Sequence, residues 1–309
     1  MAKPLISICI PTYNRANFLK ECLDSITVQF LDKEVRDNIN IFILDNQSQD
    51  NTEEVVKEFT DIFENIKYIK DDQNRNIVQG IIKVASFANG EYMWVFSDDD
   101  LHVNNSLKIV INCIKKYSSD LIFSNLSMFN NDSVINSNLL EVNSDTIINN
   151  RKELFSFLNH KFCNSIDYYT TLCSNWILKK EIFDKNNYIF EEFNGSLDLF
   201  PLPSLVFYTN IEFKSYILSK QIILYRGGNE SWGKKNKIKH FLYRDKIWRD
   251  YYWKIIINNK KKIPKYFILK VYLKNLLRII DLLKIVVIEL LVRFGLYNVV
   301  KRIVSRKHN

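Results

Sequence analysis

A buried strand that ends in three consecutive carboxylates constrains the fold of this chain more than any other feature. Residues 91–101 read Glu-Tyr-Met-Trp-Val-Phe-Ser-Asp-Asp-Asp-Leu, so an apolar, aromatic run stops at Asp98, Asp99 and Asp100. Adjacent carboxylates repel one another and resist desolvation, and a divalent cation or a sugar hydroxyl would satisfy them. Capping a helix needs one acid, not three, so the triplet predicts a metal-assisted site at the end of a core strand.

The sequence before this strand alternates between strand-like and helix-like segments. The β-rich runs cover residues 5–10, 39–44, 67–70 and 92–96. Each pair of runs is separated by a polar break and by a stretch with apolar residues at helical spacing. Within the second break, Asp50 and Glu53 are expected to cap the helix that follows. Repeated units of this length predict an α/β fold with a mostly parallel sheet and helices on both faces.

Polar segments follow three of these strands, at residues 13–15, 45–48 and 98–100. Ligands of such sheets bind beyond the carboxyl ends of the strands, so we expect the three segments to converge. The G-x-G-x-x-G and G-x-x-x-x-G-K-[ST] motifs are absent from the sequence, which argues against a dinucleotide-dependent dehydrogenase and a P-loop NTPase. A nucleotide would therefore be held by side chains and a metal ion.

The cysteines and histidines point to no disulfide framework or zinc site. The five cysteines form no C-x-x-C pair, and the first 30 residues lack a signal-peptide pattern, so a reducing cytoplasm is the expected setting. Cys9 and Cys22 lie on apolar faces and are predicted to be buried as small hydrophobic residues. The four histidines share no metal-ligand spacing.

The charge of the chain is divided unevenly along its length. Residues 233–309 hold 21 Lys and Arg against 4 Asp and Glu, whereas residues 1–232 hold 22 against 31. Residues 266–304 have the pattern of one long amphipathic helix, interrupted by charges too often to span a membrane. This basic helical region is expected to lie on an anionic membrane surface. Packing of its apolar face on the catalytic body, or on a second subunit in a homo-oligomer, is the alternative.

Three segments of the first 105 residues resemble the family 2 glycosyltransferases, bacterial enzymes of the GT-A fold that use a nucleotide-sugar donor. The segments are Ile8-Cys-Ile-Pro-Thr-Tyr-Asn-Arg15 with the apolar residues after it, Ile43-Leu-Asp-Asn-Gln-Ser-Gln-Asp-Asn-Thr52, and Gly90-Glu-Tyr-Met-Trp-Val-Phe-Ser-Asp-Asp-Asp100. They occur in the order and at the spacing of the family. The resemblance implies a GT-A domain over residues 1–232, with a donor half at 1–105 and an acceptor half at 106–232, followed by the basic region at 233–309.

The resemblance also implies a donor site and a metal site. The donor nucleotide would be bound by Pro11, Tyr13, Arg15, Asp45, Asn76 and Asp98. The cluster of Asp98, Asp99 and Asp100 is similar to the DXD motif, which holds Mn²⁺ or Mg²⁺ against the diphosphate. Many members have an acid where this chain has Ser97, so the choice between Asp99 and Asp100 as the metal ligand stays open.

A second departure from the family pattern concerns the loop before the third helix. Asn74-Arg75-Asn76 stands where members commonly have Asn-x-Gly. Asn76 is therefore expected to adopt the left-handed backbone conformation that a glycine would provide.

Family 2 enzymes generally invert the anomeric centre of the sugar. This reaction requires a base near the acceptor hydroxyl. Asp198 is the preferred candidate, because it follows the acidic cluster at about the family's distance, and Asp184, Glu191 and Glu192 are rivals. The stretch Gly228-Asn229-Glu230-Ser231-Trp232 resembles a lid in which Asn229 and Trp232 would contact a sugar, although a plain turn explains the glycines equally well.

The sequence as a whole predicts an inverting, metal-dependent glycosyltransferase. It would move a sugar, most naturally from a UDP-sugar, to a glycan or lipid-linked glycan of the bacterial surface, such as O-antigen, capsule or lipooligosaccharide. The enzyme would work at the cytoplasmic face of the inner membrane. A sugar nucleotidyltransferase is one alternative, but it normally has a Gly-rich loop after the first strand. A second alternative is a non-catalytic protein that binds nucleic acid through the basic region. In such a protein the three carboxylates would have no function.

Overall fold

The computed structural model describes residues 3–130, 133–151, 153–154, 157, 173–192, 202, 205 and 212–227. The chain divides into two units, residues 1–251 and 252–309, and every described residue belongs to the first. The predicted helix at 266–304, the whole basic region at 233–309, and the candidates Asp198, Asn229 and Trp232 therefore lie outside the described residues.

The first half of the chain forms the predicted succession of strands and helices. Its elements are β1 (Ile6–Thr12), α1 (Ala16–Thr27), η1 (Val28–Leu31), α2 (Lys33–Asn38), β2 (Ile39–Asp45), α3 (Thr52–Thr60), β3 (Ile66–Lys70), α4 (Ile77–Phe87) and β4 (Tyr92–Val95). Strand β4 is buried along its whole length, as its aromatic sequence predicts. Helix α1 buries Leu19, Cys22, Leu23 and Ile26, which recur at the spacing of one helical face. Cys9 and Cys22 are fully buried, which confirms that prediction.

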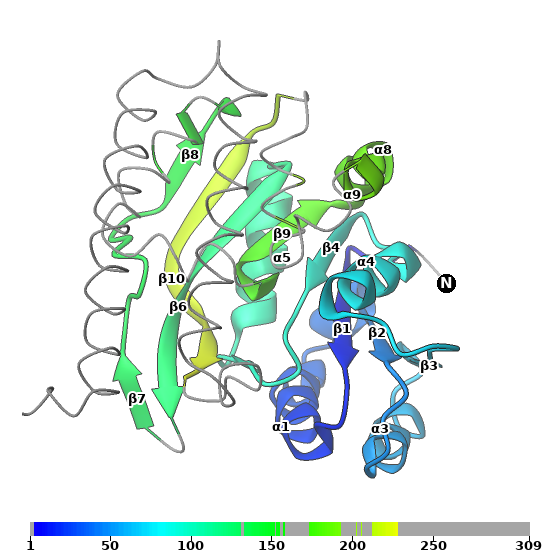
Figure 1. Ribbon diagram of the computed structural model, residues 1–309. Helices are drawn as coiled ribbons and strands as arrows, with labels where there is room; N and C mark the ends of the chain where they lie inside the picture. The colour runs from blue at the N-terminus through cyan, green and yellow to red at the C-terminus, as the bar shows by residue number, and fades with distance from the viewer. Residues whose placement is uncertain are drawn as a thin grey trace, which may run out of the picture. The chain divides into compact units, whose positions relative to one another are not determined.

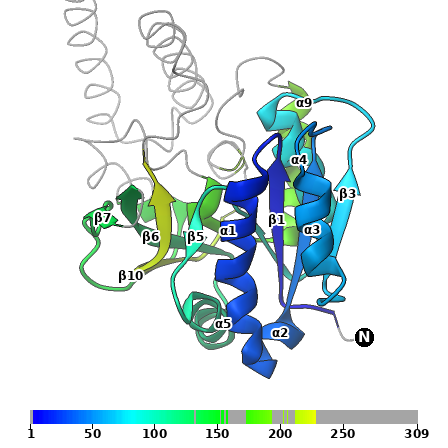
Figure 2. The ribbon, with the colours of Figure 1, turned by 90° about the horizontal axis from the view of Figure 1, so that it is seen from below.

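The second half adds shorter and less regular elements. They are β5 (Leu101–His102), α5 (Ser106–Tyr117), β6 (Leu121–Asn130), β7 (Ser133–Asn136), β8 (Thr146–Ile148), η2 (Cys173–Asn175), β9 (Trp176–Lys179), α8 (Lys180–Asn186), α9 (Tyr188–Glu192) and β10 (Ser215–Arg226). In Figure 1, α4 lies in front of the sheet beside β1 and β4, and α5 lies behind it. The turned view in Figure 2 places α1 and α5 on the side away from α4. Helices thus cover both faces of the sheet, as predicted.

The described strands form a single sheet in the order β3-β2-β1-β4-β9-β6-β10-β5, with β7 paired to β6 and β8 to β10. Strands β3, β2, β1 and β4 are all parallel. Beyond β4 the sheet is mixed, because β9 runs antiparallel to both β4 and β6 while β10 runs parallel to β6. The predicted α/β class is confirmed, and the parallel arrangement holds for the half that carries the polar segments.

Candidate active site

The loops after β1, β2 and β4 meet at one edge of the sheet, as the parallel strand directions require. Thr12, at the end of β1, donates its hydroxyl to Asp98 Oδ2 at 2.8 Å. The amide of Asn46, after β2, donates to the Thr12 carbonyl at 3.0 Å. The amide of Asn14 donates to Ser48 Oγ at 2.9 Å. The predicted convergence of the three polar segments is therefore confirmed by direct hydrogen bonds.

Asp98 and Asp99 share one cation, Arg15 of the first loop. Arg15 Nη1 lies 2.9 Å from Asp98 Oδ1 and 2.9 Å from Asp99 Oδ2. The Ser97 hydroxyl donates to the other oxygen of Asp99 at 2.5 Å. Asp99 keeps more of its side chain exposed than Asp98, 13% against 6%. Of this pair, Asp99 is therefore the carboxylate more open to a ligand.

Asp100 connects the acidic loop to parts of the chain far away in sequence. It is 1% exposed, and it accepts hydrogen bonds from Ser174 Oγ at 2.6 Å and from the Arg226 amide at 3.2 Å. Ser174 is itself fixed, since its carbonyl accepts from the Trp94 indole at 2.7 Å. Both oxygens of Asp100 are used in holding η2 and the end of β10 against the loop.

Burial makes the ionised forms of two of these acids unfavourable. Desolvation raises the pKa of Asp98 to about 6, although the nearby Arg15 guanidinium acts in the opposite direction. Desolvation, followed by the neighbouring charge of Asp99, raises the pKa of Asp100 to about 8. The site therefore holds more negative charge than the protein around it readily stabilises.

The acidic loop and the charged groups linked to it by ion pairs and hydrogen bonds carry an excess of two negative charges when all are ionised. Among the described residues the acids are Glu21, Asp98, Asp99 and Asp100, and the cations paired with them are Arg15 and Arg226. No three His, Cys, Asp or Glu side chains within the described ranges are arranged to enclose a metal ion. Mg²⁺ in nucleotide-dependent enzymes is commonly held by one or two carboxylates together with substrate phosphates, however, and hard carboxylate oxygens of this kind suit Mg²⁺ or Mn²⁺. The residues present thus fit a divalent cation whose remaining ligands come from the phosphates of the substrate.

The candidates on β1 and β2 differ in exposure. Asp45 is buried, and it accepts from the Ser48 amide at 2.7 Å and from the Tyr68 hydroxyl at 2.6 Å. Tyr13 is 43% exposed, so its ring is open for stacking on a planar ligand, and Pro11 is half-buried within β1. Tyr68, on β3, was not singled out by the sequence, since it stands in a short strand without any motif.

Asn76 does not have the left-handed conformation expected of it. Its φ is −67°, and its side chain forms a capping box with Gln79 at the start of α4. The side-chain oxygen of Asn76 accepts from the Gln79 amide at 2.9 Å, so this oxygen is used by the helix. Positive φ angles occur instead at Asn14 (52°) and Gln47 (66°), in the loops after β1 and β2. The expectation was wrong because an N-cap residue uses the extended region and any of Asn, Asp, Ser or Thr can fill it.

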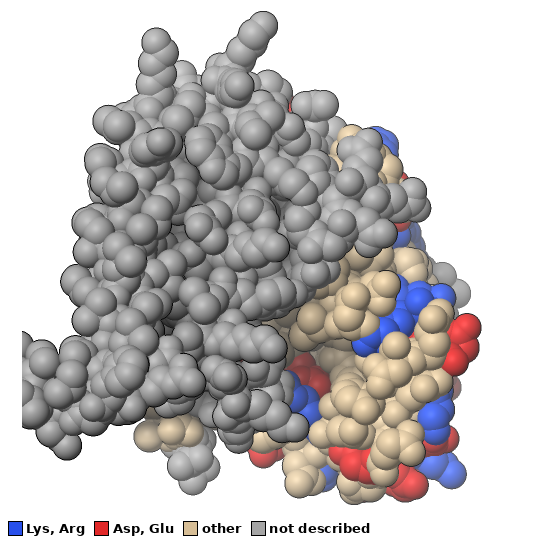
Figure 3. All heavy atoms as spheres, in the orientation of Figure 1, with Lys and Arg blue, Asp and Glu red and all other residues tan. Residues whose placement is uncertain are grey.

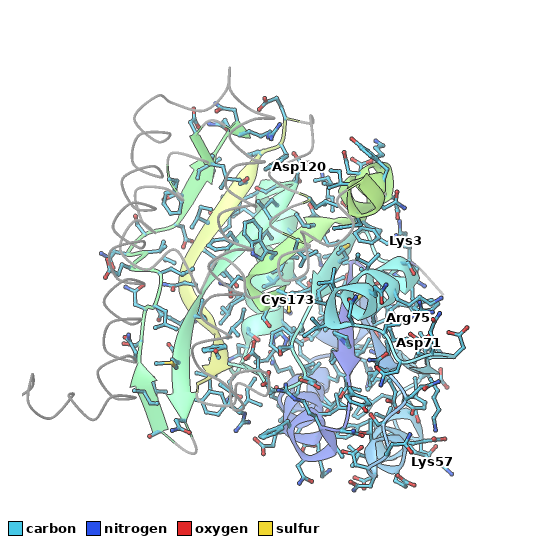
Figure 4. The ribbon with its side chains drawn as sticks, in the orientation of Figure 1. Lys3, Lys57, Asp71, Arg75, Asp120 and Cys173 are labelled. Carbon is cyan, nitrogen blue, oxygen red and sulfur yellow. The ribbon has the colours of Figure 1, made fainter. Side chains whose placement is uncertain are left out.

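The loop before α4 is attached to the end of β2 by a side-chain amide. Asn46 accepts from the Arg75 amide at 2.6 Å and donates to the Arg75 carbonyl at 2.7 Å. Arg75 pairs with Asp71 at 2.6 Å, and the two side chains are labelled together in Figure 4. This arrangement holds residues 71–76 beside the donor-side candidates.

The predicted capping pair of Asp50 and Glu53 is absent. Asp50 accepts from the Ala16 amide at 3.0 Å and from the Thr52 hydroxyl at 2.5 Å, so it joins the starts of α1 and α3. Glu53 pairs with Lys70 at 2.7 Å instead. Asp50 also accepts from the Thr52 amide at 3.2 Å, so it still satisfies one amide at the start of α3, and only the expected contribution of Glu53 is missing.

The strand directions disfavour Asp184 as a catalytic base. Helix α8 begins where β9 ends, and β9 is antiparallel to β4, so Lys179 pairs with Tyr92 at the start of β4. The Lys180 amide donates to the Glu91 carbonyl at 2.8 Å, at the same end. Asp184 follows within α8 and pairs with Lys180. Its helix thus starts at the edge opposite the acidic triplet, and Figure 1 shows α8 and α1 at opposite ends of the sheet.

Comparison with known proteins identifies the class of this fold and site. A family model described as Glycosyl transferase family 2 matches residues 7–186. Abequosyltransferase RfbV of Salmonella typhimurium is 30% identical over 250 residues, covering 77% of this chain and 71% of that protein. An uncharacterized glycosyltransferase of Mycoplasma genitalium, MG025, is 30% identical over 110 residues, 35% of this chain and 36% of that protein.

Solved structures show the same fold at lower sequence identity. S. aureus TarS 1–349 in complex with UDP-GlcNAc has a TM-score of 0.56 and 15% identity, covering 79% of this chain and 65% of that chain. Mannosyltransferase PcManGT from Pyrobaculum calidifontis, in complex with GDP-Man and Mn²⁺, has a TM-score of 0.55 and 14% identity. The match covers 89% of this chain and 70% of that chain.

The fold of the described residues is that of the GT-A glycosyltransferases, which confirms the architecture predicted for this part of the chain. Because the family model covers more than half of the chain, the chain belongs to glycosyl transferase family 2. Its enzyme class is therefore glycosyltransferase, which replaces the alternative of a sugar nucleotidyltransferase. Within the described ranges, no helix combines the length and apolar character needed to cross a membrane.

Proposed function

We propose that this protein transfers a sugar, with inversion, from a nucleoside-diphosphate sugar to a glycan of the bacterial surface. The observation that carries the proposal is the acidic loop 98–100 at the carboxyl edge of the sheet, in contact with Arg15 and Thr12. TarS in complex with UDP-GlcNAc and PcManGT in complex with GDP-Man and Mn²⁺ support a donor of this chemistry. A UDP-sugar is the first candidate.

The donor site would consist of Pro11, Tyr13, Arg15, Asp45 and Asp98. The exposed Tyr13 ring can stack on a base, and the buried Asp45 can accept a hydrogen bond from base or ribose at a lone pair that Ser48 and Tyr68 leave free. Arg15, which bridges two carboxylates at 2.9 Å, lies where a diphosphate would compete for it. Asn76 is left out, because its side chain caps α4.

For the metal site we assign the ligand role to Asp99, with Asp98 beside it. Asp100 fits poorly as a ligand, since both of its oxygens hold distant parts of the chain. Bound Mn²⁺ or Mg²⁺ would supply positive charge to the nucleoside diphosphate as it leaves. Arg15 would stabilise the same charge from the protein side.

Asp198 remains the proposed base on the acceptor side, on the ground of its sequence position. Its carboxylate would take the proton of the acceptor hydroxyl, whose oxygen then attacks the anomeric carbon on the face opposite the diphosphate. The bond from that carbon to the diphosphate oxygen breaks, and the bonding electrons leave with the nucleoside diphosphate. The new glycosidic bond therefore has inverted configuration.

The similarity to abequosyltransferase RfbV supports transfer of a sugar, and the proposed acceptor is a surface polysaccharide, such as a lipid-linked glycan. The excess of Lys and Arg over residues 233–309 would bring the enzyme to such an acceptor at an anionic membrane surface on the cytoplasmic side. Lipid and glycan, rather than nucleic acid, are then the proposed partners of the basic region.

A thermal-shift screen of nucleotide sugars, with and without Mn²⁺, tests the proposal. A donor that binds only the native state at 100 times its Kd stabilises it by about 2.7 kcal/mol, so the true donor should raise the Tm in a Mn²⁺-dependent way. Asp99→Asn should lose the Mn²⁺-dependent part of the shift, and Asp198→Asn should keep the shift while losing transfer. Asp37→Asn, at an exposed position of α2, is the matched control and should behave as wild type. A wild-type protein that no nucleotide sugar stabilises would refute the proposed function.

A further inference from the structure

Arg226, the last residue of β10, is a partly buried cation in contact with the acidic loop. Its side chain is only 11% exposed. The guanidinium carbon lies 4.5 Å from the centre of the Phe129 ring and 5.0 Å from that of Phe18. Rings at this distance attract the guanidinium, and they replace part of the water that it has lost. A cation in such a place needs polar partners for its N–H groups.

Those partners belong to the acidic loop and to α1. Arg226 Nε donates to the main-chain carbonyl of Asp99 at 3.0 Å, and the Arg226 amide donates to Asp100 Oδ1 at 3.2 Å. Its Nη2 pairs with Glu21 of α1. One side chain thus ties together α1, β10 and the loop of the proposed metal ligand, which are separated by as many as 205 residues in the sequence.

The backbone around Arg226 is also held close to its neighbour strand. The Gly227 amide donates to the Phe129 carbonyl at 2.9 Å. A Cβ atom at Gly227 would lie 2.9 Å from Met128 Sδ, so the chain here passes close to the Met128 side chain of β6. The position of the guanidinium is therefore set by the sheet rather than by the flexible side chain alone.

Fixing the Asp99 carbonyl has a consequence for the Asp99 carboxylate. The main chain of Asp99 is held by Arg226, and its two carboxylate oxygens contact Ser97 and Arg15. The Asp99 side chain therefore has little freedom to rotate. Small displacements of a ligand group cost much of its effect on a bound ion or substrate. Arg226 holds the main-chain carbonyl of Asp99 and the side chain of Asp100, so it acts on the Asp99 carboxylate through the loop.

We propose that Arg226 is a positioning residue for the cation-binding carboxylate of the active site. It holds loop 98–100 so that Asp99 presents its carboxylate to a divalent cation, and Glu21, Phe18 and Phe129 keep its guanidinium in place. The inference rests on the proposed metal-dependent function. Lysine is a poor replacement, because its ammonium lacks the planar group that fits between two rings while donating from Nε.

The test compares Arg226→Lys and Glu21→Gln with the wild type. Mn²⁺ affinity is measured by calorimetry in the presence of the nucleoside diphosphate that stabilises the wild type most. We expect a 10- to 100-fold loss for Arg226→Lys, as for other residues that orient metal ligands, and a 3- to 10-fold loss for Glu21→Gln. Saturating Mn²⁺ should restore turnover in both variants, which a general loss of structure would not allow.

Lys179→Met is the matched control, since Lys179 also forms a partly buried ion pair, with Asp120 at 2.7 Å, at the other end of β9 and β4. It should leave Mn²⁺ affinity unchanged. If Arg226→Lys folds and binds Mn²⁺ as the wild type does, the inference is wrong. If Arg226→Lys does not fold, the Glu21→Gln variant decides, because the Glu21 side chain is half exposed and its replacement should not prevent folding. Wild-type Mn²⁺ affinity in that variant would also show that the inference is wrong. A wild type without Mn²⁺-dependent binding would refute the proposed function instead.

Discussion

At the scale of single residues, neighbouring acids of one type acquire different roles from their surroundings. Asp99 is the most exposed of the triplet and faces Arg15, whereas Asp100 has both oxygens committed to Ser174 and Arg226. The sequence could predict that the triplet needs compensation, because three adjacent carboxylates after an apolar run repel one another wherever they occur. It could not distinguish Asp99 from Asp100, because the partners of Asp100 are 74 and 126 residues away.

His102 provides a prediction about pH at the same scale. Burial lowers the pKa of His102 to about 3, and its ring stacks on Phe96 with centroids 4.1 Å apart. The unfolded chain takes up a proton near pH 6.5 and the folded one does not, so this contribution to stability is complete above pH 6.5 and is lost as the pH falls. The loss is about 1.4 kcal/mol per pH unit, or about 2 kcal/mol between pH 6.5 and 5.

His102→Phe should remove this dependence, since a phenyl ring suits the aromatic surroundings and cannot be protonated. Urea unfolding of the metal-free protein at several pH values gives the free energy of unfolding, and the difference between variant and wild type isolates the histidine. Parallel curves for the two proteins between pH 7 and 5 would show that His102 is not held neutral.

At the scale of elements, local signals placed strands and helices well, and contacts between elements decided their details. The runs at 5–10, 39–44, 67–70 and 92–96 all became strands, within a residue or two of the predicted ends. Asp50 bonds to the start of α1 as well as to the start of α3, and Glu53 pairs with Lys70 of β3 instead of completing the capping pair. The order of strands after β4 was not predictable, because an apolar run has the same pattern whether its neighbour is parallel or antiparallel.

Two glycines of neighbouring elements should respond in opposite ways to the same substitution. A Cβ atom at Gly90, before β4, would lie 2.8 Å from the Ser7 nitrogen and 2.9 Å from the Tyr92 oxygen, both main-chain atoms that cannot easily move. Gly90→Ala should therefore cost about 1–3 kcal/mol of stability. At Gly80, inside α4, the nearest atom is Pro11 Cβ at 3.9 Å. Gly80→Ala should stabilise the protein by about 0.5–1 kcal/mol through helix propensity.

Thermal and urea unfolding of both variants check this pair. Each change adds one methyl group to a buried glycine; at Gly90 the methyl group meets main-chain atoms, whereas at Gly80 it has space and the helix gains propensity. Equal changes of one sign at both positions would contradict the close approach of β1 to the turn before β4.

At the scale of the whole molecule, charge separates the described body from the C-terminal region. On the face shown in Figure 3, acidic and basic side chains of the described residues are interspersed. Residues 233–309, by contrast, carry an excess of 17 positive charges. Uniform basic segments of this kind are attracted to anionic lipid surfaces, and mixed surfaces are not.

Vesicle sedimentation tests this difference. Replacing the three lysines at 260–262 by glutamine should weaken binding to anionic vesicles by about 3 kcal/mol, on the order of 100-fold, since each basic residue contributes about 1 kcal/mol near such a surface. Replacing Lys33, Lys57 and Lys67, three exposed lysines of the described body, should have little effect. A wild-type protein that stays in the supernatant at low salt would favour packing of the region on the body or on a second subunit.

The sequence by itself determined the strands and helices of the first half, the edge of the sheet where polar loops meet, and the acidic triplet there. These features depend on residue periodicity and on turns, which are local properties of the chain. Only the tertiary structure decided that Asp100 and Arg226 hold the loop, that Asn76 caps a helix, and that the second half of the sheet is mixed. Such choices depend on which distant groups come within hydrogen-bonding distance, and no local pattern encodes that.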